Sequence, residues 1–309
     1  MLSAVRSICL TILGGMFLLG SPAFSQKPQA AAPVLATIKA NPALWLVHSS
    51  AGSAYLFGSI HLLPPNIDWH SQPVQQAIEA SDVFVFEAPL GDSGTKQSTA
   101  FVQAYGMLPA ETALPSLLDE TARRDYRAAI ALAHISPDRL VHLRPWLAAL
   151  VMEVQLAETM HYSPDSGVDR QVWNYVTAQK KPVETLETVD EQLKLLMPKN
   201  DKLELDEFDA SMKELNTEAN GIGALVDAWK DGRMGEVARL MNAGLKSTPG
   251  AMKLLIDDRN ARWVTRISAM LAQHHTYFIT VGAGHIAGPR GLPALLAAKG
   301  YRVEQIAPR

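Results

Sequence analysis

Four consecutive apolar residues, Val83 to Phe86, constrain the fold of this chain more than any other segment. A strand that is apolar on both faces belongs inside a parallel sheet that helices cover on both sides. A helical pattern that opens at Pro73 precedes this strand, and a β-prone run from Tyr55 to Ile60 precedes the helix. Because strand, helix and strand follow one another, we predict a right-handed βαβ crossover.

Both ends of the chain contribute strands to the predicted sheet, and the middle is mostly helical. The other predicted strands are Leu44 to His48, Pro182 to Leu186, Tyr277 to Val281 and Arg302 to Ile306. The predicted helices are Leu117 to Leu132, Pro145 to Met160, Asp169 to Ala178, Leu203 to Leu215, Ala251 to Leu271 and about Gly291 to Lys299. We therefore expect an α/β fold with a mixed, largely parallel sheet, flanking helices and a long helical insertion at about residues 97–270.

The first residues have the pattern of a secretory signal peptide. A lone Arg6 precedes an apolar run from Ile8 to Gly20, and small residues precede a cleavage site near Ser25. The apolar run is shorter than the roughly 20 residues that a membrane-spanning helix needs. We therefore expect residues 1–25 to be removed and the mature protein to be periplasmic or secreted.

The rest of the composition excludes several classes of protein. Residues 26–41 are rich in Ala, Pro and Gln and predict a flexible leader before a single domain at 42–306. Cys9 is the only cysteine and would leave with the signal peptide, which excludes disulfides and a cysteine nucleophile. The net charge of −3 does not favour binding to nucleic acid. The chain has no second long apolar run, so we expect no membrane span after signal cleavage. The oligomeric state is left open.

Two predicted strands end in the same Gly-x-x-His pattern, at Gly58 to His61 and at Gly282 to His285. Glycine permits close backbone approach or a positive φ at a strand end, which fixes where the following imidazole points. Glu87 and Glu187 also follow predicted strands, and parallel sheets bind ligands at the carboxyl ends of their strands. A single histidine after a strand is usually structural, but four ionisable groups at one edge need pairing, a metal or a function.

These residue types support two kinds of chemistry. One is a divalent metal with His and carboxylate ligands, and the other is metal-free general acid–base catalysis by His and Glu. The chain has no His-Glu-x-x-His helix, no Gly-x-Ser-x-Gly elbow and no Gly-rich phosphate loop with Lys. Zinc-protease, serine-hydrolase and nucleotide-binding interpretations therefore lose support, whereas the spacing does not choose between metal and bare imidazole.

The chain resembles the TraB/PrgY/GumN family, which is related to the Tiki proteins, over about residues 42 to 306. The resemblance rests on Leu44-Trp45, Tyr55 to His61, Glu87, Arg144-Pro145-Trp146, Gly167-Val168-Asp169, Glu184 to Glu187, Asp258 to Trp263 and Val281 to Gly300. Because the equivalent Tiki residues are taken as the site of a metal-dependent protease, it implies that His61, Glu87 and His285 are active-site residues, and Mn²⁺, Co²⁺ or Zn²⁺ is the ion that they would bind if the site holds a metal. The resemblance supports a hydrolytic site better than it supports a metal. A fold resemblance extends to erythromycin-esterase-like hydrolases, whose catalysis is attributed to His and Glu without a metal.

Further site residues follow from the same resemblance. A charged residue in a helix is commonly solvated, but the family match favours Arg259 pointing into the site and stabilising an oxyanion, with Asn260 beside it. Glu187 either joins the site or caps the helix that follows it. Asp169 begins a predicted helix, so it either belongs to the site or caps that helix.

The function expected from the sequence is that of an exported hydrolase. The first hypothesis is a metal-dependent peptidase or amidase that uses His61, Glu87 and His285 on a peptide or small-molecule substrate. Two alternatives stay open: a non-catalytic protein that captures a peptide in the same cleft, and a metal-independent, esterase-like hydrolase.

Overall fold

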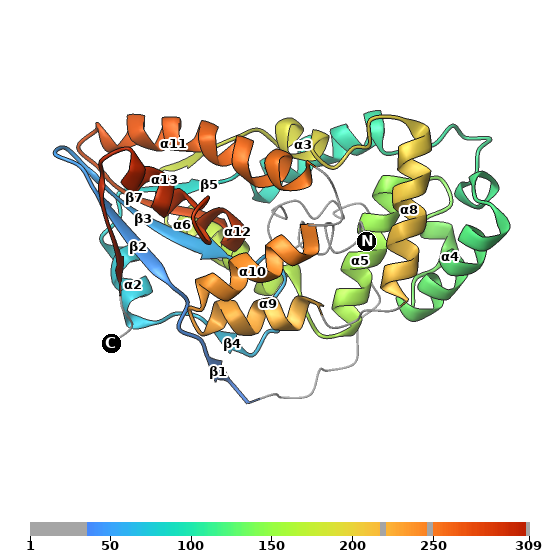
Figure 1. Cartoon of the computed structure of the whole chain (residues 1–309), viewed down its shortest axis with the longest axis horizontal. Helices are drawn as coiled ribbons and strands as arrows, with labels where there is room; N and C mark the ends of the chain where they lie inside the picture. The colour runs from blue at the N-terminus through green and yellow to red at the C-terminus, as the bar shows by residue number, and fades with distance from the viewer. Residues whose placement is uncertain (1–35, 217–220, 246–249, 307–309) are drawn as a thin grey trace.

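A six-stranded sheet with the strand order β6-β5-β7-β3-β2-β8 forms one end of the molecule in the computed structural model, which describes residues 36–216, 221–245 and 250–306 (Figure 1). The strands are β2 (Leu44–His48), β3 (Ser53–Ser59), β5 (Val83–Phe86), β6 (Val183–Thr185), β7 (Thr276–Gly282) and β8 (Arg302–Ile306). β3, β5, β6 and β7 run parallel, and β2 is antiparallel to its neighbours β3 and β8. The mixed, largely parallel sheet built from both ends of the chain is confirmed.

Helices surround this sheet and fill the middle of the chain, as the sequence predicts. They are α2 (Gln72–Glu79), α3 (Gly91–Tyr105), α4 (Glu120–Leu132), α5 (Pro145–Thr159), α6 (Val168–Ala178), α7 (Val189–Lys194), α8 (Asp201–Leu215), α9 (Gly221–Lys230), α10 (Met234–Leu245), α11 (Asp258–Leu271), α12 (Ala283–Ile286) and α13 (Leu292–Ala298). Within the described ranges, no helix has the length and apolar character that a membrane crossing requires.

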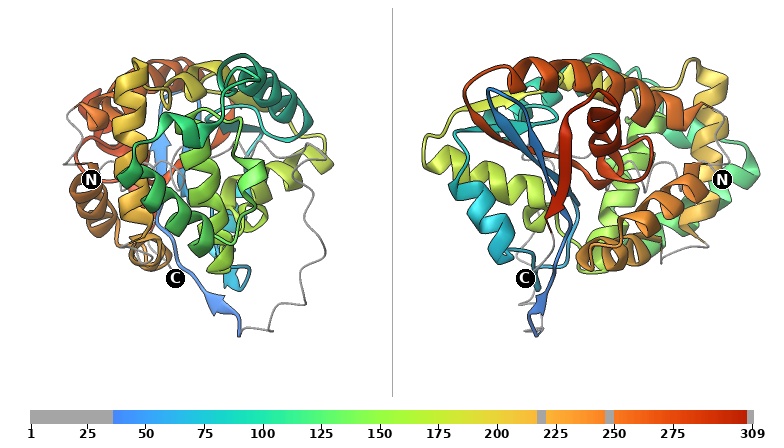
Figure 2. Two further views of the ribbon diagram at one scale, coloured as in Figure 1. Left: turned by 90° about the vertical axis from the view of Figure 1, so that its right-hand side faces the viewer. Right: turned by 60° about the vertical axis from the view of Figure 1, so that its left-hand side comes forward.

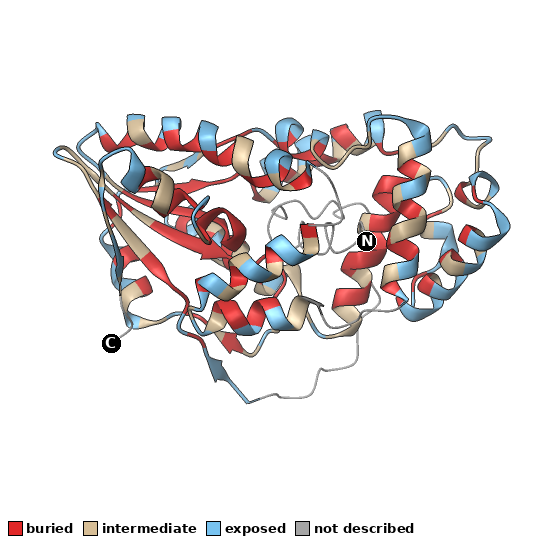
Figure 3. Ribbon diagram, viewed as in Figure 1, coloured by how far each residue is buried: buried red, intermediate tan, exposed pale blue. Residues whose placement is uncertain are grey.

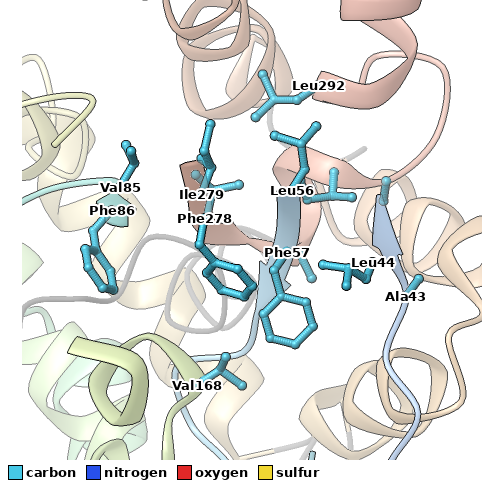
Figure 4. Packing of buried hydrophobic residues seen from close by; sticks show 14 of the residues in the cluster. Ala43, Leu44, Leu56, Phe57, Val85, Phe86, Val168, Phe278, Ile279 and Leu292 are labelled. Carbon is cyan, nitrogen blue, oxygen red and sulfur yellow. The ribbon is translucent and has the colours of Figure 1, made fainter. Parts of the chain in front are cut away.

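Both faces of the sheet are buried, which explains the unbroken apolar run in β5. In Figure 2, α2 and α6 lie on one side of the sheet and α13 lies on the other. Figure 4 shows aromatic side chains of three strands pointing towards Val168 of α6 and aliphatic side chains pointing towards Leu292 of α13. The aromatic set is Phe57, Phe86 and Phe278, and the aliphatic set is Leu56, Val85 and Ile279. Each such buried side chain contributes about 1.5–3 kcal/mol of apolar burial.

The helices of the insertion form a second hydrophobic core away from the sheet. α4, α5 and α8 pack together there, and α5 is buried along most of its length (Figure 3). Glu204 of α8 is almost fully buried and accepts hydrogen bonds from the Arg144 side chain and, at 3.1 Å, from the backbone N–H of Trp146. The Arg-Pro-Trp stretch of the family resemblance therefore joins α5 to α8 and lies outside the candidate site.

A small parallel sheet stands at the start of the described chain. β1 (Ile38–Lys39) pairs with β4 (Ile67–Asp68), so these two residues of the expected leader are hydrogen-bonded to the fold. The backbone N–H of Asn41 also donates to the carbonyl of Lys230, at 2.6 Å. The expected signal peptide at 1–25 lies outside the described residues.

Candidate functional site

The carboxyl ends of β3, β5, β6 and β7 carry the ionisable residues that the sequence singles out. The backbone packs closely around glycine at two positions. A Cβ on Gly58 would lie 3.1 Å from the Cα of Ala283, and a Cβ on Gly167 would lie 2.3 Å from the carbonyl oxygen of His61. Close approach, and not a positive φ, is therefore the reason for glycine at Gly58 and Gly167.

His285 is completely buried and has a defined protonation state. It lies in the short helix α12, which follows β7 directly. Its Nε2 is 2.8 Å from Nη1 of Arg259, and its Nδ1 is 2.7 Å from Oδ1 of Asn260. A guanidinium has no acceptor, so Nε2 accepts and Nδ1 carries the proton that it donates to Asn260. Burial lowers the pKa of His285 well below its usual value, and the charges of Arg259 and His61 add to this effect, so the imidazole is neutral.

Arg259 is fully buried and uses all five of its N–H donors inside the protein. Nη2 donates to Glu87 Oε2 and to Glu187 Oε1, both at 2.6 Å, and Nε donates to Glu187 Oε2 at 3.1 Å. Nη1 donates to His285 and to the carbonyl of Leu255. No donor remains for a substrate oxyanion, so we assign Arg259 to holding Glu87 and His285 in place instead of the expected oxyanion role.

A π-helical turn precedes Arg259, which lies on the buried face of α11. Lys253–Asp257 forms this turn immediately before α11, and π-turns within helices occur frequently at functional sites. Arg259 donates to the carbonyl of Leu255 within the turn, and its guanidinium lies over the ring of Trp263 at 4.5 Å. Asn260, the next residue, donates to the carbonyl of Arg290 at 2.8 Å and thereby anchors the segment after α12.

Glu87 joins four elements of the fold. Its Oε1 accepts the backbone N–H of Gly282 at 2.7 Å, and its Oε2 accepts Nε2 of Gln192 at 2.9 Å as well as Arg259. Both oxygens therefore act as acceptors, as in an ionised carboxylate. These contacts tie the end of β5 to β7, α7 and α11.

Glu187 belongs to the buried network and does not cap α7. The cap is a capping box formed by Thr188 and Glu191, which satisfies the first backbone donors of that helix. Burial raises the pKa of Glu187, the ion pair with Arg259 opposes this rise, and the charge of Glu87 adds to it. For Arg259, burial disfavours the charge, but attraction to Glu87 and Glu187 outweighs it and raises the pKa.

His61 has a carboxylate beside its imidazole. Its Nδ1 is 2.7 Å from Oδ1 of Asp169, and the two side chains are only 3% and 9% exposed. Asp169 lies in the first turn of α6 without capping it, and the backbone N–H of Val168 donates to the carbonyl of Ile60. The structure thus places Asp169 against the first Gly-x-x-His segment, where the sequence left a helix cap as the alternative.

A pocket lies where these residues meet. It is lined by His61, Phe86, Glu87, Ala88, Leu90, Asp169, Gln192 and Thr280, and it has room for about one water molecule. Sequence reasoning missed Gln192 and Thr280. Thr280 had a signal, because it interrupts the apolar run from Tyr277 to Val281 in β7, whereas Gln192 had none beyond its position shortly after Glu187.

The arrangement of the donor atoms does not fit the metal that the resemblance implies. The lone pair of His285 Nε2 faces Arg259, and both oxygens of Glu87 accept N–H donors. Arg259 supplies the positive charge between these ligands, so a metal shared by His61, Glu87 and His285 would have to displace it. Among the described residues, no group of three or more His, Asp or Glu side chains is placed to hold a metal ion. The metal stays a prediction of the resemblance.

The comparisons with known proteins agree with the family resemblance. The model of the TraB/PrgY/gumN family matches residues 43–305. The uncharacterized protein YbaP of Shigella flexneri is 24% identical over 256 residues, which cover 82% of this chain and 92% of that protein. The uncharacterized protein YbaP of Escherichia coli (strain K12) is 24% identical over 243 residues, which cover 78% of this chain and 87% of that protein. An uncharacterized protein of Treponema pallidum (strain Nichols) is 22% identical over 265 residues, which cover 80% of this chain and 78% of that protein. No solved structure gives a significant match.

Proposed function

Because this chain belongs to the TraB/PrgY/gumN family and pairs a buried histidine with an aspartate in a pocket, we propose that it is a hydrolase in which His61 activates water. The observation that carries the proposal is the distance of 2.7 Å between Nδ1 of His61 and Oδ1 of Asp169. Both residues line the pocket together with Glu87.

Asp169 gives His61 the properties of a general base. A carboxylate beside Nδ1 favours the tautomer that carries its proton there, which leaves Nε2 as the basic nitrogen. The same carboxylate stabilises the imidazolium that forms when His61 takes a proton from water. The hydroxide equivalent then attacks the carbonyl carbon of an ester or amide, the C–O or C–N bond to the leaving group breaks, and His61 returns the proton to that group.

Glu87 acts as the second pocket carboxylate, and the buried network holds it in position. Arg259, Gln192 and the backbone of Gly282 hold its two oxygens, so its orientation does not depend on a substrate. We assign it to orienting the attacking water. Arg259, Asn260, Glu187 and His285 are positioning residues in this proposal, because they do not line the pocket.

The test is hydrolysis by the purified protein of a panel of p-nitrophenyl esters and of a peptide library analysed by mass spectrometry. We expect turnover that a chelator leaves unchanged and that His61→Ala lowers by about 10²–10⁴-fold. His274→Ala is the matched control, since His274 is exposed and lies outside the site. Turnover that His61→Ala leaves unchanged would remove the proposal, and turnover that needs added Mn²⁺, Co²⁺ or Zn²⁺ would replace it with the metal-dependent peptidase.

We also propose that the hydrolase acts outside the cytoplasm. The support is the signal-peptide pattern of residues 1–25. The mass of the protein recovered from the periplasm or the medium measures this directly. We expect the mature chain to begin near Gln26, and an intact Met1 in the recovered protein would contradict export by cleavage.

A further inference from the structure

Residues 36–41, which the sequence predicts as the end of a flexible leader, are hydrogen-bonded to the fold. In the parallel pairing of β1 with β4, the backbone N–H of Ile38 donates to the carbonyl of Asn66 at 2.8 Å. The backbone N–H of Ala40 donates to the carbonyl of Asp68, also at 2.8 Å, and the side chain of Ala40 is buried in the main hydrophobic core. We call residues 36–41 the N-terminal strap.

The N-terminal strap also completes the C-terminal end of α9. The last carbonyls of a helix have no partner within the helix and need one from outside. The carbonyl of Lys230, the last residue of α9, accepts the backbone N–H of Asn41 at 2.6 Å. The preceding residue, Trp229, is fully buried, and its indole N–H donates to the carbonyl of Gly58 at 2.7 Å. The strap is thereby connected through α9 to the end of β3, three residues before His61.

The chain from Gly58 to Ile67, here called the His61 segment, is held at both of its ends. Trp229 holds it before the imidazole, and the pairing of β4 with β1 holds it after the imidazole. His285 has different support, because side chains of α11 hold its ring. We propose that the N-terminal strap positions His61 through these two contacts, so that release of the strap loosens the His61 segment and leaves the His285 segment ordered.

The purpose of this arrangement rests on the proposed function, because a general base works only from a fixed orientation. The structural claim does not depend on turnover. Local opening allows backbone amides to exchange with solvent, and a segment that loses a hydrogen bond to its support opens more often. Amide exchange therefore measures the effect of the strap on the His61 segment without any substrate.

The test is hydrogen–deuterium exchange of the full mature chain, followed by mass spectrometry of peptides that cover residues 58–67 and 282–286. Ile38→Pro removes the N–H that joins the strap to β4 and keeps an apolar side chain at an exposed position. We expect residues 58–67 to exchange about five- to tenfold faster than in the wild type, and residues 282–286 to change less than about twofold. Lys39→Ala is the matched control, since it removes only the exposed ion pair of the strap and should leave both segments unchanged.

Trp229→Phe tests the second contact, because it keeps an aromatic side chain and removes the N–H that Gly58 accepts. It should accelerate exchange in the same residues 58–67. With a substrate that the wild type turns over, Ile38→Pro and Trp229→Phe should lower kcat more than they raise KM, because a misplaced base slows the chemical step.

Three results would overturn the positioning role of the strap. They are unchanged exchange in Ile38→Pro, whatever Trp229→Phe does, equal acceleration of the two segments, and an unchanged kcat in a variant whose His61 segment exchanges faster. Absence of turnover in the wild type would remove the proposed hydrolase, whereas the exchange measurement would still decide whether the strap orders the His61 segment.

Discussion

The two Gly-x-x-His segments share one local design and lie in opposite electrostatic surroundings. Each histidine presents Nδ1 to a side-chain oxygen at 2.7 Å, which belongs to the carboxylate of Asp169 for His61 and to the amide of Asn260 for His285. A carboxylate stabilises a protonated imidazole, whereas a neutral amide together with Arg259 at Nε2 opposes protonation. The repeated pattern therefore determines where an imidazole lies, and the partners determine whether it can act as a base.

The largest effect should come from making the two histidines alike. Asp169→Asn gives His61 the neutral partner that His285 has, and we expect it to lower kcat by about 10²–10⁴-fold with little change in stability. The measurement is ester or amide turnover beside a urea unfolding curve for each protein. Full activity in Asp169→Asn would show that the carboxylate is not needed and would break the comparison.

The next largest effect concerns the stability of the buried network around His285. Arg259→Met leaves Glu87 and Glu187 buried without their cation, and we expect a loss of about 3–5 kcal/mol in the free energy of unfolding. The measurement is the urea midpoint at constant m-value. Arg239→Met is the matched control, because Arg239 also pairs with a glutamate on a helix but is exposed, and it should leave the midpoint unchanged. Equal midpoints for Arg259→Met and wild type would contradict the role of Arg259.

A smaller effect follows from the pKa of His285. This pKa is lowered in the folded protein by burial and then by Arg259 and His61, so below the usual value near 6.5 the unfolded chain binds a proton that the folded chain excludes. The contribution is therefore complete above pH 6.5 and is lost as the pH falls, by about 1.4 kcal/mol for each unit.

The comparison of wild type with His285→Gln isolates this contribution. Urea unfolding at pH 7, 6 and 5 should show a steeper loss of stability in the wild type than in the variant. Burial raises the pKa of Glu187, which gives a dependence of opposite sign, but Glu187 is present in both proteins and its direct effect largely cancels in the difference. Parallel pH profiles of the two proteins would show that His285 is not held neutral.

The fold was largely predictable because its elements follow local rules. An apolar run such as Val83 to Phe86 needs two covered faces, and helices lie on both sides of the sheet that contains it. The strand ends then place His61, Glu87 and His285 at one edge of the sheet, as the parallel topology requires.

The partners of these residues could not be predicted, because they come from distant elements. Arg259 lies on the buried face of α11, as its spacing to Trp263 indicates, but its partners Glu87 and Glu187 follow strands that are distant in the sequence. The contact between Asp169 and His61 depends on the close approach of Gly167 to the end of β3, which is a tertiary property. Gln192 is a buried acceptor only because Glu87 accepts its –NH₂ group, so no local pattern could mark it.

Removal of metal ions should have the smallest effect on turnover, and it again tests the surroundings of His285. Metal analysis of protein purified without added ions should find far less than one equivalent of Mn, Co or Zn, and chelation should leave turnover unchanged. The reason is that Arg259 already occupies the lone pair of His285 and one oxygen of Glu87, so a metal would have to displace a buried, fully hydrogen-bonded guanidinium. One equivalent of metal that both His61→Ala and His285→Ala lose, and that His274→Ala retains, would establish the two histidines as joint ligands. The two Gly-x-x-His segments would then serve a single ion, and their opposite surroundings in this structure would describe only the metal-free protein.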